Sequence, residues 1–252
     1  MGNAENAAAL EMTLAGGCFE FESGAVIALT GADFETGIPM WTAVEVKPGE
    51  QIRCGHARSG ARCYLCVRGG IDVPLVLGSA STHILTGLGG YHGGPLKRGA
   101  VLMARTADAD HASNTRARRA ASPPLGTTGG PIRVTAASSA HQLCGCAWEV
   151  RPDSNRMGLR LRGPALDSPA GDMLTEGVPL GAIQLPPDGQ PIVLFVEHQT
   201  TGGYRKIANV ISADFHGLGQ LRAGDRVRFE EVSMDAALAL LEAQEEWLHS
   251  LA

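Results

Sequence analysis

Turn-forming residues set the strongest constraint on how this chain can fold. The sequence has 33 glycines and 14 prolines among 252 residues, and this density interrupts most stretches before a long helix can form. Hydrophobic residues still make up 44% of the chain and charged residues only 19%, which is typical of a folded protein with a sizeable core. Many short elements separated by turns predict a mainly β protein.

Three stretches repeat one local pattern, in which a basic residue stands two positions before a glycine and alternating apolar positions follow. They are residues 47–52, 97–102 and 222–227. In the third, Val227 and Phe229 alternate with Arg226 and Arg228, as in a strand with one buried face. Each stretch predicts a tight turn, in which glycine supplies a positive φ, followed by a strand. The uneven spacing does not fit a solenoid and suits a barrel built of hairpins.

Two continuous apolar runs and one amphipathic segment complete the predicted elements. Residues 25–29 and 192–196 are apolar runs bounded by turn residues, which predicts strands buried on both faces. Near the C-terminus, Ser233 can cap a helix, with Leu241, Leu248 and Leu251 at helical spacing on its inner face. We therefore expect two β-rich halves and one C-terminal helix.

Residues 106–131 contain almost no large apolar side chain, so they predict a linker or mobile loop. This divides the chain into an N-terminal β-rich half, residues 1–105, and a C-terminal half, residues 132–252. Inside the linker, Arg116, Arg118 and Arg119 form a basic cluster. A solvated loop is the simpler interpretation of this cluster, and a site for a phosphate or an acidic partner is the alternative.

Charge and hydropathy argue against two classes of partner. The formal net charge is −5 and the isoelectric point is near 5.9, so the chain lacks the basic field that drives non-specific nucleic-acid binding. No uncharged apolar run reaches about 18 residues, and the N-terminus carries Glu5 and Glu11 without a basic segment. We expect a cytoplasmic protein with reduced cysteines and with neither a nucleic acid nor a membrane as partner.

The cysteine spacing gives weak signals for metal or redox chemistry. Cys63 and Cys66 form a C-x-x-C motif inside a strand-like run, where residues three apart face opposite sides of a sheet. Cys144 and Cys146 are predicted to share one face of a strand, but no further ligand accompanies them. Packing is the favoured interpretation for both pairs, and we expect no metal.

Two glycine-dense stretches are candidate binding loops, because glycines let a backbone approach a ligand closely. The first, residues 69–94, serves equally well as a set of tight turns. The second follows the apolar run 192–196 directly and gathers polar groups at a strand end. Its members are Glu197, His198, Gln199, Thr200, Thr201, Gly202, Gly203, Tyr204 and Lys206.

Catalytic or binding roles can be suggested for the residues at the two ends of this second stretch. A hairpin turning at Gly202 and Gly203 would place Glu197 opposite Lys206. In a desolvated pocket Lys206 can then polarise a carbonyl or hold a phosphoryl or carboxylate group, while Glu197 or His198 moves protons. An exposed hairpin with a cross-strand ion pair is the alternative. Upstream, Asn155 and Arg156 offer an amide and a guanidinium fork for an anion, against the alternative of an Asx turn with a surface arginine.

Several motifs resemble one known family in sequence and in order. In the C-terminal half they are DSNRMGLRLRGP (153–164), EGV (176–178), GAIQLPPDGQP (181–191), QTTGGYRKIA (199–208), ISAD (211–214) and GDRV (224–227). In the N-terminal half they are LTGAD (29–33), PMW (39–41), ARSG (57–60) and GGIDVP (69–74). The chain resembles the KipA family, also described as the C subunit of 5-oxoprolinase, allophanate hydrolase subunit 2 and biotin-dependent carboxyltransferase. The resemblance covers nearly the whole chain.

The resemblance implies a cyclophilin-like β-barrel architecture and an obligate complex. Family members act with a KipI-like partner and a LamB-type partner in the ATP-dependent opening of 5-oxoproline, a lactam, to glutamate. A related region transfers a carboxyl group from biotin to urea, and a third alternative is a non-catalytic regulator that binds a KipI-like kinase inhibitor. The resemblance thus implies ATP at the level of the complex, and biotin only under the second alternative.

The sequence also departs from the family pattern. It lacks the family's N-terminal segment, and Arg205 stands where the family's Gly-Gly-Tyr-Pro-Lys motif has proline, with Lys206 retained. The leading hypothesis is a subunit, inactive alone, of an ATP-dependent amide or lactam hydrolase. Under this hypothesis Lys206, Arg156 and Asn155 bind the activated intermediate or a carboxylate. Glu197 is an acid/base candidate, and residues 199–204 line the substrate-binding site.

Overall fold

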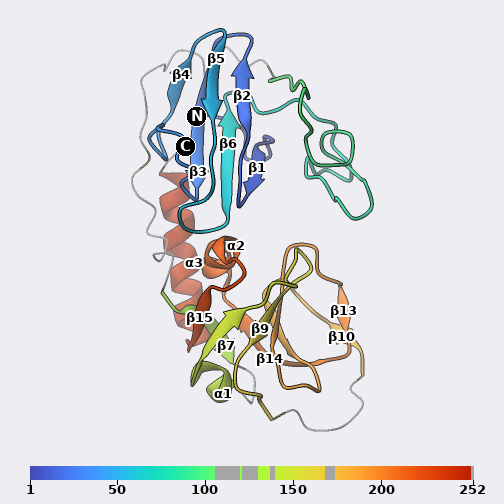
Figure 1. Cartoon of the computed structure of the whole chain (residues 1–252). Helices are drawn as coiled ribbons and strands as arrows, with labels where there is room; N and C mark the ends of the chain where they lie inside the picture. The colour runs from blue at the N-terminus through green and yellow to red at the C-terminus, as the bar shows by residue number, and fades with distance from the viewer. Residues whose placement is uncertain (106–119, 121–129, 137–139, 168–173, 251–252) are drawn as a thin grey trace. The chain divides into compact units, whose positions relative to one another are not determined.

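The computed structural model describes residues 1–105, 120, 130–136, 140–167 and 174–250, and the chain forms two compact units. They comprise residues 1–123 and 124–251 (Figure 1). The division falls inside the segment expected to be a linker, 106–131. Most of that segment, including Arg116, Arg118 and Arg119, lies outside the described residues.

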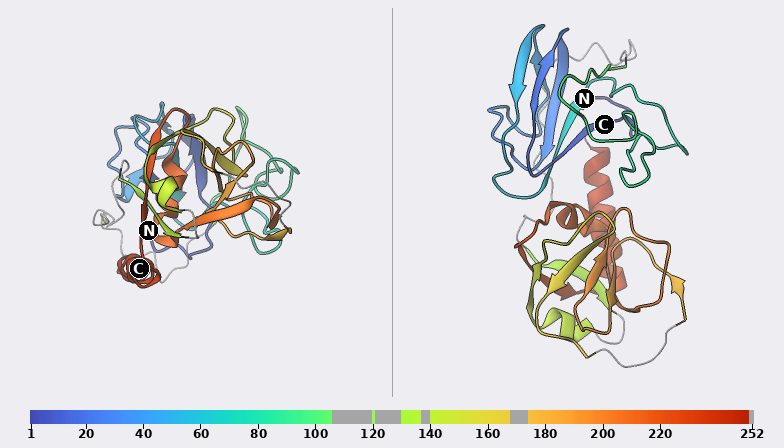
Figure 2. Two further views of the ribbon diagram at one scale, coloured as in Figure 1. Left: turned by 90° about the horizontal axis from the view of Figure 1, so that it is seen from below. Right: turned by 45° about the vertical axis from the view of Figure 1, so that its right-hand side comes forward.

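The N-terminal unit is built on two antiparallel sheets, visible in Figure 2. A four-stranded sheet has the order β1-β6-β3-β4 and a second sheet pairs β2 with β5. The strands are β1 (Leu10–Thr13), β2 (Cys18–Phe21), β3 (Ala25–Gly31), β4 (Val44–Val46), β5 (Glu50–Arg53) and β6 (Arg62–Val67). The apolar run 25–29 forms most of β3, where Ile27 and Leu29 are fully buried. This unit therefore has a core of its own.

Residues 69–105, all of which the structure describes, form no helix or strand of their own. The glycine-dense stretch 69–94 consists of turns and isolated bridges, such as those between Val76 and Ser79 and between His83 and Leu88. A Cβ atom on Gly89 would meet the Ser81 carbonyl oxygen, and one on Gly93 would meet the Gly87 carbonyl oxygen. These glycines thus allow close packing within the stretch itself, in agreement with the tight-turn interpretation.

The C-terminal unit contains a closed β-barrel with the strand order β11-β12-β9-β8-β15-β7-β14. The strands are β7 (Ile132–Ala136), β8 (Ala147–Val150), β9 (Gly158–Arg162), β11 (Ala182–Leu185), β12 (Ile192–Leu194), β14 (Arg205–Val210) and β15 (Arg226–Glu231). Neighbouring strands are antiparallel except for β15 and β7, which are parallel. A two-stranded ribbon joins β10 (Glu176–Gly177) to β13 (Thr201–Gly202). The mainly β prediction and the barrel are confirmed.

One large aromatic residue anchors the barrel core. Trp148 on β8 is fully buried, and its Nε1 donates to the Leu143 carbonyl oxygen at 2.9 Å. Leu143 belongs to the short helix α1 (Ala140–Cys144). The prediction that Cys144 and Cys146 share a strand face is wrong, because Cys144 ends this helix and Cys146 precedes β8. Both cysteines pack against the barrel core.

The C-terminal helix is confirmed, but its inner face differs from the prediction. Helix α3 (Met234–His249) is capped by Ser233, whose Oγ accepts from the Ala236 N–H at 3.2 Å. The buried residue of this helix is Ala237, which packs against Ile211 and Ala213. Ala213 belongs to the 3-10 turn η2 (Ser212–Asp214), which is followed by helix α2 (Phe215–Gln220). Leu248 is 46% exposed, whereas Leu251 lies outside the described residues.

The three turn-and-strand repeats have different outcomes. Strand β5 follows Gly49, and β15 follows Gly224, whose φ is +88°. At Gly99 the turn forms, with the Ala100 N–H donating to the Lys97 carbonyl oxygen, but no strand follows it. The run 192–196 is strand only as far as Leu194.

None of the described helices is long and apolar enough to cross a membrane.

Candidate functional site

Strands β11 and β14 carry two polar side chains on the outer face of the barrel. Ile183, Leu185 and Ile207 belong to the barrel core, so the side chains that alternate with them point outward. Those outward residues are Gln184 and Lys206, which pair directly across the two strands. Directly paired residues share a face with their Cβ atoms about 5 Å apart. The two side chains therefore leave the sheet on the same face, next to the register shift between Ile183 and Gln184.

The ribbon of β10 and β13 supplies a carboxylate to this lysine. Glu176 on β10 is paired with Gly202 on β13, and its Oε2 lies 3.7 Å from the Lys206 Nζ. The side chains are 26% exposed at Lys206 and 41% exposed at Glu176. The ammonium group is thus partly shielded and held by a carboxylate that water still reaches.

Gln184 is almost completely buried beneath the loop that leads to β14. It is 1% exposed, and its Nε2 donates to the Tyr204 carbonyl oxygen at 3.2 Å. Its Oε1 accepts from the Gln199 Nε2 at 3.4 Å. Sequence reasoning placed Gln184 in a family motif without giving it a role. The available signal was a polar residue between Ile183 and Leu185 in a strand that is otherwise apolar.

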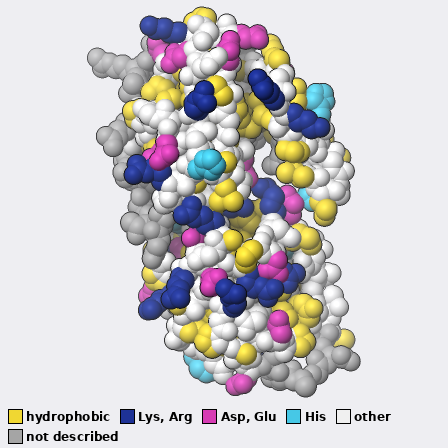
Figure 3. Space-filling model, viewed as in Figure 1, with side chains coloured by type: hydrophobic (Ala, Val, Ile, Leu, Met, Phe, Trp, Pro, Cys, Tyr) yellow, Lys and Arg dark blue, Asp and Glu magenta, His cyan; other side chains and the backbone are white. Residues whose placement is uncertain are grey.

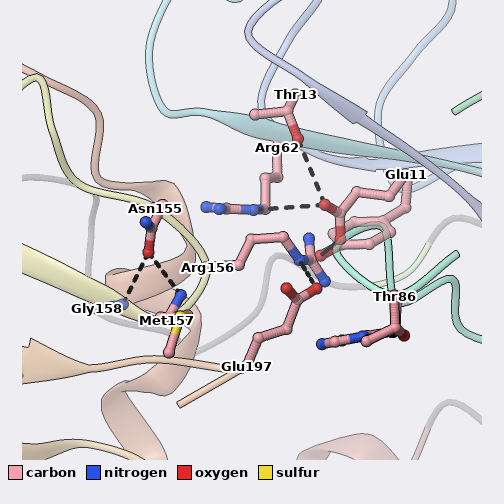
Figure 4. A network of polar contacts seen from close by, with 11 residues as sticks. Glu11, Thr13, Arg62, Thr86, Asn155, Arg156, Met157, Gly158 and Glu197 are labelled. Carbon is pink, nitrogen blue, oxygen red and sulfur yellow. Dashed lines mark hydrogen bonds and ion pairs between the residues drawn. The ribbon is translucent and has the colours of Figure 1, made fainter. Parts of the chain in front are cut away.

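A second polar cluster lies where β9 begins and β12 ends. The Arg156 Nε donates to the Glu197 Oε1 at 2.6 Å, and the Glu197 N–H donates to the Arg156 carbonyl oxygen at 2.8 Å (Figure 4). The side chains are 32% exposed at Arg156 and 14% exposed at Glu197. Backbone and side-chain bonds together fix this ion pair.

Asn155 has a mainly structural role in the turn that precedes β9. Its Oδ1 accepts from the Met157 N–H at 2.9 Å and from the Gly158 N–H at 3.3 Å (Figure 4). Its own N–H donates to the Gly158 carbonyl oxygen at 3.1 Å. This is the Asx turn that the sequence left as an alternative. The turn orients the neighbouring Arg156.

The expected pairing of Glu197 with Lys206 across a hairpin is wrong. Strand β11 lies between β12 and β14 and pairs with both, so the two segments are not hairpin partners. Glu197 instead bonds Arg156, and Lys206 faces Glu176. The prediction assumed that segments adjacent in sequence pair as a hairpin. In the barrel, β11 instead lies between β12 and β14 and separates them.

The remaining predicted binding residues lie in the loop and ribbon between β12 and β14. Thr201 and Gly202 form β13, and the Thr200 carbonyl oxygen accepts from the Val178 N–H at 3.0 Å. The exposed members are Gln199, Thr200, Thr201, Gly203 and Tyr204. They present carboxamide, hydroxyl and phenol groups to solvent beside Lys206. Figure 3 shows that acidic and basic side chains are interspersed on the visible surface.

Cys54 and Cys63 are the buried cysteines in the part of the chain that the structure describes. No group of three or more His, Cys, Asp or Glu side chains is arranged to hold a metal there. Burial raises the pKa of Cys54 to about 11 and that of Cys63 to about 12. Since the thiolate is the reactive form, these two thiols are inert at neutral pH.

Comparisons with known proteins place this barrel and the N-terminal unit in one family. The model described as "Carboxyltransferase domain, subdomain A and B" matches residues 1–231. The C subunit of the 5-oxoprolinase of Escherichia coli K12 is 35% identical, over 100% of this chain and 84% of that protein. The urea amidolyase of Saccharomyces cerevisiae is 32% identical, over 100% of this chain but only 15% of that protein.

Solved structures agree with these matches. The crystal structure of the Kluyveromyces lactis urea amidolyase has a TM-score of 0.84 and 31% identity, covering 97% of this chain and 17% of that one. The family motifs along the sequence, the barrel and both comparisons agree, and the chain belongs to the family of carboxyltransferase domains, subdomains A and B.

Proposed function

We propose that this chain is a subunit of an ATP-dependent amide or lactam hydrolase of the 5-oxoprolinase type. The observation that carries the proposal is its 35% identity to the C subunit of a 5-oxoprolinase over 84% of that protein's length. The polar groups around Lys206 support it, because carboxamides and hydroxyls suit the N–H and C=O of a small lactam. The reaction takes place in the reducing cytoplasm, where the cysteines stay as thiols.

Lys206 is the cation we assign to the activated substrate. Its contact with Glu176 is long, at 3.7 Å, and Glu176 is 41% exposed, so the pair is weak. A carboxylate or phosphoryl group on the substrate can replace Glu176 as the partner of the ammonium group. Gln199, Thr200 and Thr201 then offer hydrogen bonds to the amide, beside Gly202, Gly203 and Tyr204.

Arg156 and Glu197 form a separate functional pair in this proposal. The Glu197 carboxylate accepts the Arg156 Nε–H, which holds the guanidinium in one orientation for binding an anion. The Asx turn at Asn155 fixes the backbone beside it. Glu197 is also the group we assign to proton transfer, because it is the carboxylate nearest to this guanidinium among the contacts that the structure describes.

The proposed complex needs partner subunits and ATP to activate the substrate. We propose a KipI-like partner and a LamB-type partner, with ATP consumed at the level of the complex. In the described part of the C-terminal unit, Lys206 lies on β14 whereas Arg156 lies in the turn before β9, and each contacts a carboxylate. This arrangement does not fit a cradle for a triphosphate, so no step through ATP is assigned to this chain.

The second candidate function is carboxyl transfer from biotin to a urea-like substrate. The observation in its favour is the structural match to urea amidolyase, with a TM-score of 0.84. It requires a biotinylated carrier and a biotin carboxylase as partners. Both candidates act on a small amide, and they differ in whether product formation depends on biotin.

Reconstitution with the KipI-like and LamB-type partners tests the proposal. Wild-type chain, Lys206→Ala and the control Lys47→Ala are each assayed for ATP-dependent glutamate release from 5-oxoproline. Lys47 lies in the exposed turn before β5, so its variant should match wild type. Loss of about a hundredfold in Lys206→Ala is expected for a cation that binds the reacting group. Full turnover by Lys206→Ala contradicts the assignment. Carboxylation of urea that needs a biotinylated carrier and that avidin abolishes, in the absence of glutamate release, favours carboxyl transfer.

A further inference from the structure

One buried side chain, Gln184, supports the loop that carries the proposed substrate contacts, in addition to the pairing of β10 with β13. Gln184 is 1% exposed although it points to the outer face of the barrel. Its carboxamide is buried because residues 199–204 pass over it, and both ends of the amide are used. Nε2 donates to the Tyr204 carbonyl oxygen and Oε1 accepts from Gln199. A buried carboxamide satisfied at both ends fixes the groups around it.

Gly202 shows how closely the loop approaches this amide. A Cβ atom placed on Gly202 would overlap the Gln184 Nε2, and its next contacts would also be Gln184 atoms. The neighbouring Gly203 has nothing within 4 Å of such an atom. Neither of these glycines has a positive φ. Gly202 is therefore needed for space rather than for backbone conformation, and the space it leaves is filled by Gln184.

We propose that Gln184 is the positioning residue of the Lys206 site, locking residues 199–204 onto the barrel so that Lys206, Gln199 and the ribbon carboxylate Glu176 keep their relative places. The inference rests on the proposed function of Lys206. Gln184 pairs directly with Lys206 across β11 and β14, while Glu176 pairs with Gly202 across the ribbon. The carboxamide thus bonds the loop on both sides of β13, at Gln199 before this strand and at Tyr204 after it.

Three variants separate this role from simple packing. Gln184→Met keeps the length of the side chain and removes both hydrogen bonds, Gly202→Ala inserts a methyl group against the amide, and Gly177→Ala, where a Cβ atom would meet nothing within 4 Å, is the matched control. In the reconstituted complex, Gln184→Met and Gly202→Ala should lower kcat by about tenfold to a hundredfold, as expected for a misplaced reacting group. KM for the lactam should change much less, and Gly177→Ala should match wild type.

A double variant tests whether the two positions act together. Replacing Gln184 with alanine removes the atoms that the Gly202→Ala methyl group would meet. Adding Gly202→Ala to Gln184→Ala should therefore cost no further kcat, whereas the same change in wild type costs about tenfold or more. Strict additivity of the two losses would overturn a direct contact between them.

Limited trypsin digestion supplies a readout that does not depend on the reaction. Trypsin cleaves after Arg205 and Lys206, which begin β14, and local opening of the loop governs access. Gln184→Met should be cleaved there several times faster than wild type, with cleavage elsewhere unchanged. Equal cleavage together with wild-type kcat overturns the proposal.

The outcomes also separate this inference from the proposed function. Faster cleavage with unchanged kcat shows that Gln184 only packs the loop and overturns its positioning role. If wild type opens no lactam while Gln184→Met is still cleaved faster, the proposed function fails, and the loop anchor remains as a feature of another reaction. In that case the same variants, assayed for biotin-dependent carboxyl transfer, must show the kcat loss for the positioning role to hold.

Discussion

Lys206 and Gln184 are directly paired residues of β14 and β11, yet their side chains differ in solvent exposure. The Lys206 side chain is 26% exposed and faces the carboxylate of Glu176, while Gln184 is 1% exposed and bonds the loop above it. The same face of the barrel thereby carries a partly exposed cation, Lys206, and a buried carboxamide, Gln184, that holds the loop in place. The predictions below follow from this arrangement and from the other ion pairs of the C-terminal unit.

Glu176→Gln should strengthen binding of the anionic substrate. Under the proposed function Glu176 competes with the substrate for Lys206, so removing its charge should lower KM a few-fold, while the free energy of unfolding changes by less than about 1 kcal/mol. Glu149→Gln is the control, since Glu149 pairs with Arg162 on β8 and β9. A higher KM in Glu176→Gln would mean that Glu176 helps to bind the substrate.

Arg156→Lys should lower activity by about tenfold although it keeps the positive charge, because an ammonium group cannot reproduce the planar fork of a guanidinium. The matched control is Arg160→Lys on β9, whose contact with Asp153 is long, at 3.8 Å. Steady-state kinetics of the reconstituted complex measure both. Equal activity in the two variants would remove Arg156 from the anion-binding role.

Asp214→Ala should be the most destabilising of the acidic substitutions. Asp214 is 4% exposed and accepts from the backbone N–H of Arg133 and from its guanidinium, and this hydrogen bond raises the pKa of Arg133. Removing the carboxylate takes this acceptor from the Arg133 backbone N–H and from its partly exposed guanidinium, which should cost about 1–3 kcal/mol. Urea unfolding measures the loss. Asp235→Ala, in the exposed first turn of α3, should cost less than about 1 kcal/mol.

The N-terminal unit should lose stability at high pH. Burial raises the pKa of Cys63 to about 12 and of Cys54 to about 11, from an ordinary 9.0. Above pH 9 the unfolded chain releases these protons while the folded chain keeps them, so the stability present below pH 9 is lost as the pH rises toward 11 and 12. Each thiol contributes a slope of at most about 1.4 kcal/mol per pH unit.

The comparison that isolates this effect is between wild type and Cys63→Ala under reducing conditions. Between pH 9 and 10, the free energy of unfolding should fall less steeply in Cys63→Ala. Cys18→Ala is the control, because Cys18 is exposed. Parallel pH profiles for wild type and Cys63→Ala would show that the buried thiol does not control the alkaline transition.

Local signals in the sequence predicted elements well where one residue determines the conformation. Ser233 identifies the start of α3, and the alternation of Val227 and Phe229 with arginines identifies β15. The Asx turn at Asn155 was recognised as an alternative for the same reason. Where packing decides, the prediction was less accurate: Leu248 is 46% exposed, whereas Ala237 is buried against Ile211 and Ala213.

The candidate site shows what sequence alone could not supply. Residues 197–206 were identified as polar and close in sequence, but their partners come from distant segments. Glu197 meets Arg156, Lys206 meets Glu176, and Gln184 supports the loop. These contacts depend on the register of β11 with β14 and of β10 with β13, which no local pattern encodes.

Omission of single components from a reconstituted complex tests the central claim most directly. This chain, a KipI-like partner and a LamB-type partner from one source are combined with ATP and 5-oxoproline, and glutamate release is measured with each component left out in turn. The account predicts glutamate release from the full set and none when this chain is absent. Undiminished release without this chain, or none from a stable complex of all three, would contradict it.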